Sequence, residues 1–379
     1  MRLDVRTTIF AEMSALAVAT GSINLGQGFP DTDGPDALLE AAVAAIRGHE
    51  HNQYPPGPGI PGLRAAIAAH QRHHYGLEVD PDSGVLVTAG ATEAIAAAVL
   101  GLTEPGDEVV VFEPYYDSYA ATITLAGCTR RVVTLRPRPG PEGAPTHWGF
   151  DPDQLRAAVT DRTRLLLLNT PHNPTGTVFD DDELGQLAAL AREHDLVVVS
   201  DEVYEHLVFD GLRHRPIATL PGMAERTLTL GSAGKTFSVT GWKIGWASGP
   251  AHLVAATRGV KQFLTYVNGG PFQPAVAEAL RTTTDAQYTD LAKDLQVRRD
   301  LFCAGLPDVF VPQATYFATV DVHRDGVEFC RELPGKIGVV AIPSKVFYDS
   351  DAGDTLVRLA FCKRPEVLEE ARRRWEELP

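Results

Sequence analysis

Short apolar runs alternate with longer segments of helical periodicity between about residues 85 and 250. Several of the apolar runs lack an in–out alternation of polar positions, which is typical of strands buried on both faces of a sheet. The expected strands are Val85–Thr88, Glu108–Phe112, Arg131–Leu135, Thr163–Leu168, Leu196–Ser200 and Thr227–Leu230. The expected helices are Thr92–Leu102, Asp181–Glu193 and one that starts at the capping pair Asp151-Pro152. This order predicts an α/β fold with a mainly parallel sheet covered on both faces.

The two ends of the chain differ from this middle part. Residues 1 to about 30 hold one short helical segment and the Gly/Pro-rich stretch Gly26–Pro30. From about residue 275 onward, helical segments precede three strand candidates, which are Thr315–Val320, Val339–Ile342 and Leu356–Phe361. We therefore expect a large domain over residues 31–275 and a smaller α+β domain built from residues 1–30 and 276–379. Surface loops are expected at Asn52–Pro61 and Pro137–Pro145.

Composition narrows the class of protein. The 379-residue chain has a net charge of −15 and no Lys/Arg-rich tract, so nucleic acid and anionic membranes are not expected partners. The longest apolar runs are too short to cross a bilayer. Arg2, Asp4 and Arg6 occupy the positions where the apolar core of a signal peptide would begin. The four cysteines have no metal or redox spacing, which favours reduced thiols and a cytoplasmic enzyme.

Polar residues at the ends of predicted strands are candidates for chemistry, because an open α/β sheet binds ligands at that edge. Asp201 follows an apolar strand, so it is either a solvated loop acid or a buried acid that faces a cation. Lys235 lies among Gly, Ser and Ala, which suits either a surface lysine or an amine that a ligand can approach closely.

Two further candidates lie elsewhere in the chain. The stretch Pro171–Gly176 is a rigid turn that either serves structure alone or aims the amide of Asn173 into a crevice. Arg358 lies inside an apolar strand, where it either pairs internally or awaits a carboxylate that its guanidinium can grip at two points.

Three other motifs are set aside. Gly234-Lys235-Thr236 imitates the end of a phosphate-binding P-loop, but the first glycine of that motif would fall on Thr229, so a nucleoside triphosphatase is not expected. Gly26-Gln-Gly28 is too short for a dinucleotide fingerprint. His70, His73 and His74 have metal-ligand spacing without a nearby carboxylate, so we expect a solvated helix face and no metal site.

Taken in order, these segments resemble the fold-type I, pyridoxal 5′-phosphate (PLP) dependent aminotransferases of class I/II. Asn24–Asp31, Glu113–Asp117 and Gly231–Trp246 are similar to one subgroup, which holds kynurenine, glutamine and methionine transaminases and cysteine-conjugate β-lyases. The resemblance is greatest to actinobacterial N-succinyldiaminopimelate aminotransferases. It implies a seven-stranded sheet, a PLP cofactor, a homodimer with shared active sites, and ping-pong transfer of an amino group between an amino acid and a 2-oxo acid.

The resemblance also assigns roles around the cofactor ring. Lys235 would bind PLP covalently, and Asp201 would pair with the protonated pyridine nitrogen. Tyr204 and Asn173 would hydrogen-bond the phenolic oxygen of the ring, and Tyr116 would stack on its face.

Phosphate and substrate contacts follow in the same way. By this resemblance, the phosphate would be held by the backbone at Ala91 and Thr92, by the side chains of Ser232 and Lys243, and by Tyr54 from a second subunit. The substrate would be held by Arg358, Asn173, the backbone at Gly28 and the aromatic ring of Phe10.

Some positions depart from the family pattern and leave the substrate open. Ala91 and Thr92 stand where many relatives have a glycine and an aromatic residue, so stacking from that loop is lost. Asn268-Gly269-Gly270 replaces an aromatic residue and a histidine of kynurenine-type enzymes, which predicts a roomier pocket. A β-eliminating lyase on the same scaffold and a PLP-binding module without turnover stay as alternatives.

Overall fold

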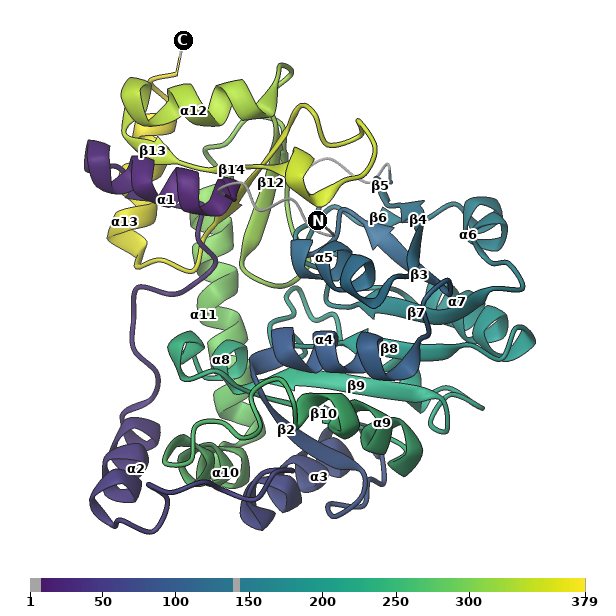
Figure 1. Cartoon of the computed structure of the whole chain (residues 1–379). Helices are drawn as coiled ribbons and strands as arrows, with labels where there is room; N and C mark the ends of the chain where they lie inside the picture. The colour runs from purple at the N-terminus through teal and green to yellow at the C-terminus, as the bar shows by residue number, and fades with distance from the viewer. Residues whose placement is uncertain (1–7, 139–143, 379) are drawn as a thin grey trace.

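A seven-stranded sheet forms the centre of the computed structural model, which describes residues 8–138 and 144–378. Its strand order is β2-β10-β9-β8-β7-β3-β4 (Figure 1). The strands are β2 Val85–Ala89, β3 Glu108–Glu113, β4 Thr129–Thr134, β7 Thr163–Asn169, β8 Val197–Asp201, β9 Thr227–Ser232 and β10 Ile244–Ser248. Six strands run in one direction, and β10 runs antiparallel to both of its neighbours. The predicted mainly parallel α/β sheet is confirmed, whereas β10 was not among the expected strands.

Burial on both faces explains the unbroken apolar runs. Along β7, Leu165 and Leu167 pack into the hydrophobic cluster on one face, and Leu166 and Leu168 pack into the cluster on the other. The first face is covered by α4 Gly90–Leu102, α5 Asp117–Ala126 and α9 Ala251–Lys261. The opposite face is covered by α3 Pro61–Tyr75, α6 Pro152–Ala158, α7 Asp181–Glu193, α10 Phe272–Thr282 and, near the sheet's β2 edge, α2 Asp36–Arg47.

Both ends of the chain build a second, smaller unit (Figure 1). A four-stranded sheet has the order β11-β12-β15-β14, with β11 Val309–Phe310, β12 Phe317–Asp321, β14 Ile342–Pro343 and β15 Leu356–Ala360. The N-terminal segment joins it because β1 Ile23–Asn24 pairs in parallel with β13 Val339–Val340. The helices of this unit are α1 Ile9–Thr20, α12 Gly326–Ile337 and α13 Pro365–Trp375, and the long α11 Asp285–Cys303 leads into it. The domain limits at residues 30/31 and 275/276 stay a prediction.

The remaining elements are short, and one predicted helix cap and one predicted loop are present in the structure. The short elements are β5 Arg136–Pro137, β6 Trp148–Gly149, α8 Ala233–Thr236 and the 3-10 turns Ile217–Thr219, Thr240–Trp242 and Ser344–Phe347. Asp151 caps α6 by accepting a hydrogen bond from the Asp153 N–H. Residues 52–60 form the expected loop before α3, whereas residues 139–143 of the other expected loop lie outside the described residues, as do Arg2, Asp4 and Arg6.

The sequence predicts reduced cysteines and apolar runs that are too short to cross a bilayer. All four cysteines are free thiols, and Cys303, Cys330 and Cys362 are buried. Within the described part of the chain, no helix combines the length and the apolar character needed to cross a bilayer.

Candidate active site

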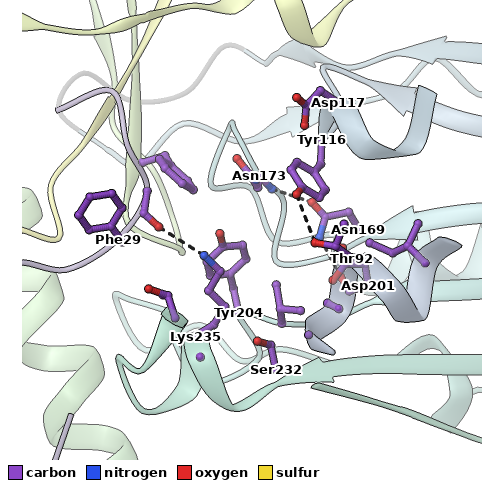
Figure 2. A pocket seen from close by; sticks show the side chains of 18 of the residues that line it. Phe29, Thr92, Tyr116, Asp117, Asn169, Asn173, Asp201, Tyr204, Ser232 and Lys235 are labelled. Atoms are coloured by element: carbon purple, nitrogen blue, oxygen red, sulfur yellow. Dashed lines mark hydrogen bonds between the residues drawn. The ribbon is translucent and has the colours of Figure 1, made fainter. Parts of the chain in front are cut away.

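A cavity of about 480 Å³ lies at the carboxyl edge of the large sheet, where β7, β8 and β9 end. Parallel strands bring their carboxyl ends to one edge, so residues far apart in sequence meet there. Twelve of the thirteen expected cofactor and substrate residues line it; they are Phe10, Gly28, Ala91, Thr92, Tyr116, Asn173, Asp201, Tyr204, Ser232, Lys235, Lys243 and Arg358. Figure 2 shows Lys235 and Tyr204 entering this cavity from one side, and Tyr116 and Thr92 from the other.

Asp201 is a buried acid at the end of β8. Its Oδ2 accepts a hydrogen bond of 2.6 Å from the Tyr119 hydroxyl, while its Oδ1 has no hydrogen-bond partner among the described residues. Burial raises the pKa of the Asp201 carboxyl to about 6, although the bond from Tyr119 opposes that rise. The alternative of a solvated loop acid is therefore wrong, and one buried oxygen is left for a donor that the described residues do not supply.

Lys235 is held with its amine in the cavity. Its Nζ lies 2.6 Å from the Tyr316 hydroxyl and 3.3 Å from the Gly28 carbonyl oxygen. Burial lowers the pKa of Lys235 to about 8, because the charged ammonium loses hydration there. A surface lysine is excluded, and the lowered pKa leaves a larger neutral share of this amine near physiological pH than an exposed lysine has.

The first turn of α4 forms a polar cradle next to Ser232 and Lys243. The first N–H groups of a helix have no intrahelical partner, so those at Ala91 and Thr92 are free to bind an anion. Gly245 on β10 permits the close approach, because a Cβ there would lie 2.6 Å from the Gly90 carbonyl carbon and 2.7 Å from the Ala91 nitrogen. The donor set therefore suits a phosphate.

Arg358 is buried on β15 without an ion-pair partner among the described residues. Its Nη1 donates to Asn173 Oδ1 at 3.2 Å, its Nη2 donates to the Gly26 carbonyl at 3.0 Å, and its Nε has no partner. Aromatic rings surround the guanidinium, with the Phe317 centroid 4.1 Å away. Burial lowers the pKa of Arg358 to about 10. The guanidinium is thus open to a carboxylate from outside the chain.

Comparison with known proteins decides the family. Residues 20–374 match the family model of aminotransferase class I and II. The chain belongs to the class I and II aminotransferases. The predicted family, fold and enzyme class are confirmed: this aminotransferase moves an amino group between an amino acid and a 2-oxo acid, and PLP is the cofactor of its family.

The similar proteins differ in the substrates that they are named for. This aminotransferase is 54% identical to the probable N-succinyldiaminopimelate aminotransferase DapC of Mycobacterium tuberculosis, over 97% of this chain and 95% of that one. It is 40% identical to the methionine aminotransferase of Escherichia coli (98% and 96% covered) and 38% identical to the mouse kynurenine–oxoglutarate transaminase 3 (96% and 86% covered). The solved structure of N-succinyldiaminopimelate aminotransferase from Mycobacterium tuberculosis matches with a TM-score of 0.94 at 54% identity, over 98% and 97% of the two chains.

Sequence reasoning missed three polar residues of the aminotransferase site. Tyr119 and Tyr316 contact Asp201 and Lys235 across separations of 82 and 81 residues. Asn169 ends β7, and its Oδ1 accepts a 2.8 Å hydrogen bond from the Asn173 N–H. Its Nδ2 donates to the Asp201 carbonyl at 2.8 Å, so it ties the Asn173 turn to β8. A polar residue ending an apolar strand was the available signal for Asn169.

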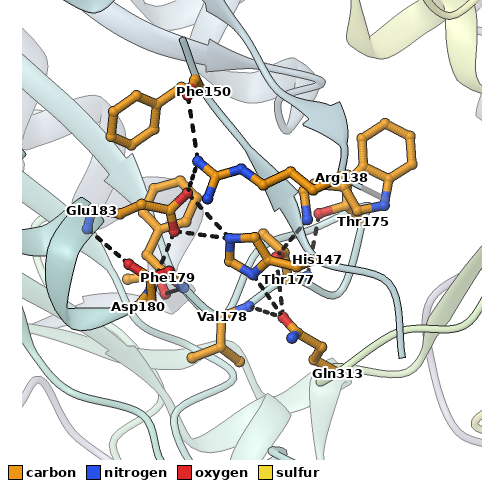
Figure 3. Close-up of polar contacts among 12 residues, drawn as sticks. Arg138, His147, Phe150, Thr175, Thr177, Val178, Phe179, Asp180, Glu183 and Gln313 are labelled. Atoms are coloured by element: carbon orange, nitrogen blue, oxygen red, sulfur yellow. Dashed lines mark hydrogen bonds and ion pairs between the residues drawn. The ribbon is translucent and has the colours of Figure 1, made fainter. Parts of the chain in front are cut away.

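A polar network fixes the turn that carries Asn173 (Figure 3). The Thr177 hydroxyl donates to Gln313 Oε1 at 3.1 Å, and the Val178 N–H donates to the same oxygen at 3.0 Å. The buried Glu183 pairs with Arg138 at 2.8 Å and with His147 at 3.0 Å. Because His147 Nδ1 also lies 3.2 Å from the Thr177 hydroxyl, the turn is anchored through His147 to α7 as well as to the segment before β12. The hydrogen bond from Arg358 gives Asn173 a contact in the cavity.

Tyr54 is the one expected site residue that does not line the cavity of its own chain. It is 80% exposed and makes an edge-to-face contact with Tyr266, with ring centroids 5.6 Å apart. Asn268 also lies away from the cavity lining, and its Nδ2 donates to the Thr88 carbonyl at 2.9 Å. Neither residue therefore lines the cavity of its own chain.

The expected solvated histidine face is wrong for His70. His70 is only 5% exposed, and its Nε2 lies 2.8 Å from Nε2 of His206, which follows Tyr204. His74 is half-buried, whereas His73 is exposed as expected and contacts Asp285 at 2.9 Å. The tertiary fold brings His206 to this helix, which no local pattern of the sequence indicates.

Proposed function

We propose that this aminotransferase binds PLP covalently at Lys235 and that its amino-acid substrate is N-succinyldiaminopimelate. The observation that supports the cofactor site is that one cavity contains both a buried Asp201 oxygen without a hydrogen-bond partner and the buried amine of Lys235. The substrate assignment is supported by the 54% identity to the probable DapC of Mycobacterium tuberculosis. That relative is named for transfer of the amino group of N-succinyldiaminopimelate, which is an amino acid. We propose that this enzyme likewise serves amino-acid biosynthesis.

The residues present fit PLP at each of its polar groups. The pyridine N–H would satisfy Asp201 Oδ1, and a protonated ring nitrogen would favour the charged carboxylate that burial alone disfavours. The phosphate would occupy the cradle formed by α4, Ser232 and Lys243. Tyr204 and Asn173 would donate to the phenolic oxygen, and Tyr116 would cover one ring face.

When bound, PLP supplies an electron-withdrawing ring that makes the Cα proton of an attached amino acid removable. Lys235 is placed to move that proton, since an amine with a pKa of about 8 can both take up and release a proton near neutral pH. Tyr316 and the Gly28 carbonyl hold the free amine in the cavity by hydrogen bonds. Tyr316 is therefore a positioning residue for Lys235.

Arg358 would bind the substrate α-carboxylate, with Asn173 beside it and the ring of Phe10 lining the pocket. A carboxylate entering this buried site would meet a permanently charged guanidinium that forms no ion pair within the described residues. A guanidinium at 5.5 Å from the centroid of Phe10 also keeps that ring in the pocket wall. Every amino-acid substrate carries this α-carboxylate, so Arg358 gives orientation and leaves discrimination to the remaining lining.

We further propose a homodimer in which Tyr54 completes the phosphate site of the partner. Exposed aromatic side chains support this, because Tyr54, Phe263 and Tyr266 are 80%, 84% and 53% exposed. The four free thiols are compatible with the cytoplasm, which we propose as the site of action.

A donor and acceptor panel tests the substrate assignment. N-succinyldiaminopimelate, methionine, kynurenine and glutamine are each offered with 2-oxoglutarate, and both 2-oxo acid and glutamate formation are measured. The expected result is the highest kcat/KM for N-succinyldiaminopimelate. A higher kcat/KM for methionine or kynurenine overturns the substrate, and pyruvate from a cysteine conjugate in excess of amino-group transfer with every donor would favour a β-lyase.

A further inference from the structure

Three histidines from two distant segments meet outside the lining of the active-site cavity. His70 and His74 lie one turn apart on α3, and His206 follows β8. One ring nitrogen from each lies within 4.8 Å of the other two, and the Nε2 atoms of His70 and His206 are 2.8 Å apart. This cluster is not part of the cavity that holds Lys235.

The cluster has the chemistry of a metal-ligand set. Burial lowers the pKa of all three rings, which favours the uncharged imidazole form. Neutral imidazoles are strong ligands for first-row transition metals. His70 is almost fully buried, and Nε2 is its only ring nitrogen with a polar partner among the described residues, so this ring presents Nε2 to the cluster.

The distances suit one small ion. Zinc binds imidazole nitrogen at about 2.0–2.1 Å with tetrahedral angles, which places neighbouring ligand nitrogens roughly 3.4 Å apart. The observed separation of 2.8 Å and the upper bound of 4.8 Å bracket that value. Small side-chain rotations would therefore bring the three nitrogens into position, with the ion replacing the proton that His70 and His206 share.

Access and rigidity also favour a site. His74 and His206 line a surface cleft of about 510 Å³, through which an ion could enter and from which water could supply a fourth ligand. The ring of Tyr288 stacks on His206 with centroids 3.9 Å apart and an interplanar angle of 14°, which limits its rotation. Three protein ligands with one open position are a common zinc arrangement.

We propose that His70, His74 and His206 bind one divalent transition-metal ion of the zinc class. The ion would link α3 to the segment that carries Asp201 and Tyr204, since His206 follows Tyr204 by two positions. This site lies outside the transamination chemistry and does not depend on the proposed substrate or on Lys235. Its expected effect is a higher melting temperature of the loaded protein with the cofactor site unchanged.

Zinc titration of tag-free holoenzyme tests the site after dialysis against a chelator. Isothermal titration and metal analysis are expected to give one zinc per chain, and zinc is expected to raise the melting temperature. His74→Gln should lower the affinity at least about tenfold, in line with the effect of disturbing metal ligation. His73→Gln is the matched control on the same helix, because His73 is exposed and does not reach His206; it should bind zinc like the wild type.

His206→Asn provides the second ligand variant, and its visible absorbance after PLP loading reports whether it is folded. Loss of zinc binding in folded His206→Asn and His74→Gln, with retention in His73→Gln, supports the proposal. Absence of zinc binding by the wild type, or equal affinity in the wild type and His74→Gln, overturns it. Loss in His73→Gln but not in His206→Asn would instead place the ion on the outer group of His73, His74 and Asp285, and would also overturn it.

Discussion

Burial destabilises the charged form of the Asp201 carboxyl group, and the hydrogen bond from Tyr119 stabilises that form. Its pKa rises from 3.8 to about 6, so the folded apoenzyme holds a proton that the unfolded chain releases at lower pH. Such a group contributes stability below pH 4 that is lost as the pH rises through 6, at a cost of about 3 kcal/mol by the conversion of pKa shift to free energy. The bound PLP ring would reverse this cost by supplying a donor for Oδ1.

Asp201→Asn is therefore expected to affect the two forms of the enzyme in opposite directions. At pH 7.5 the apoenzyme variant should be more stable than wild-type apoenzyme, by up to about 3 kcal/mol. With PLP bound, the variant should be less stable than the wild type, because an amide does not balance a protonated ring nitrogen. Chemical denaturation of apo and holo forms at pH 7.5 and pH 4 checks this. Equal destabilisation of both forms at pH 7.5 would contradict the burial argument.

Tyr316 tests the positioning of the catalytic amine. Tyr316→Phe removes the 2.6 Å contact with Lys235 Nζ and keeps the ring in place. Since a hydrogen bond to a charged group is worth about 1.5–3 kcal/mol, kcat should fall roughly 10- to 100-fold with little change in KM. Steady-state kinetics with a saturating 2-oxo acid measure the split. Tyr348→Phe is the control, since Tyr348 is buried outside the cavity; an equal loss of kcat there would point to a general effect on stability.

The place of a residue in the cavity was predictable where the residue ends an apolar strand or belongs to a motif. Asp201, Lys235 and Arg358 stand out from their apolar or small-residue surroundings in the sequence. Tyr119 and Tyr316 do not, because a tyrosine on a helix or beside a strand is ordinary in a hydrophobic core. Their polar contacts exist only once the fold closes sequence separations of 82 and 81 residues.

At the level of elements, β10 and α4 are fitted to each other through glycine. A Cβ at Gly245 would lie 2.6 Å from the Gly90 carbonyl carbon, closer than carbon atoms can pack. Gly245→Ala should displace the first turn of α4 and weaken the N–H groups aimed at the phosphate. We expect at least about tenfold weaker PLP binding and a destabilisation of roughly 1–3 kcal/mol, as for other overpacked sites.

PLP titration followed by absorbance, together with thermal unfolding, measures both effects. Gly185→Ala is a matched control, because Gly185 lies inside α7 at a position where an added methyl group would point into open space. That substitution should stabilise the helix by about 0.5–1 kcal/mol and leave PLP affinity unchanged. Unchanged PLP affinity in Gly245→Ala would contradict the proposed phosphate cradle.

The elements predicted best were the parallel strands whose two faces are both buried. Such strands are unbroken apolar runs, as in Leu165–Leu168, and need no knowledge of their partners. The strand Ile244–Ser248 was missed because it contains glycine, alanine and serine, and the glycine, Gly245, is small because the first turn of α4 approaches it closely. The small residues are visible in the sequence, but the sequence does not show which elements pack against them.

At the scale of the whole molecule, the exposed position of Tyr54 is consistent with the proposed homodimer. If Tyr54 of one chain completes the site that contains Lys235 of the other, two inactive variants should restore each other. Lys235→Ala and Tyr54→Ala homodimers are unfolded and refolded together in equal amounts. Half of the dimers are then mixed, and each mixed dimer has one intact site, so about a quarter of all sites should be active.

Activity of the mixture measured against each variant refolded alone checks this arrangement. The Tyr54→Ala homodimer sets the background, and Tyr54→Phe separates the hydroxyl from the ring. No recovery in the mixture, with mixed dimers demonstrated by mass, would place Tyr54 outside the partner's site. A fully active monomer on a light-scattering column would contradict the dimer itself.

The fold as a whole brings together the segments that line the cavity, and the proposed chemistry depends on a covalent bond between PLP and Lys235. Borohydride reduction of the PLP-loaded enzyme, followed by proteolysis and mass spectrometry, tests it directly. We expect one pyridoxyl group per chain, on the peptide that contains Lys235, and none in Lys235→Ala. A pyridoxyl group on Lys243 or another lysine, or none on any peptide, would show that Lys235 does not bind the cofactor.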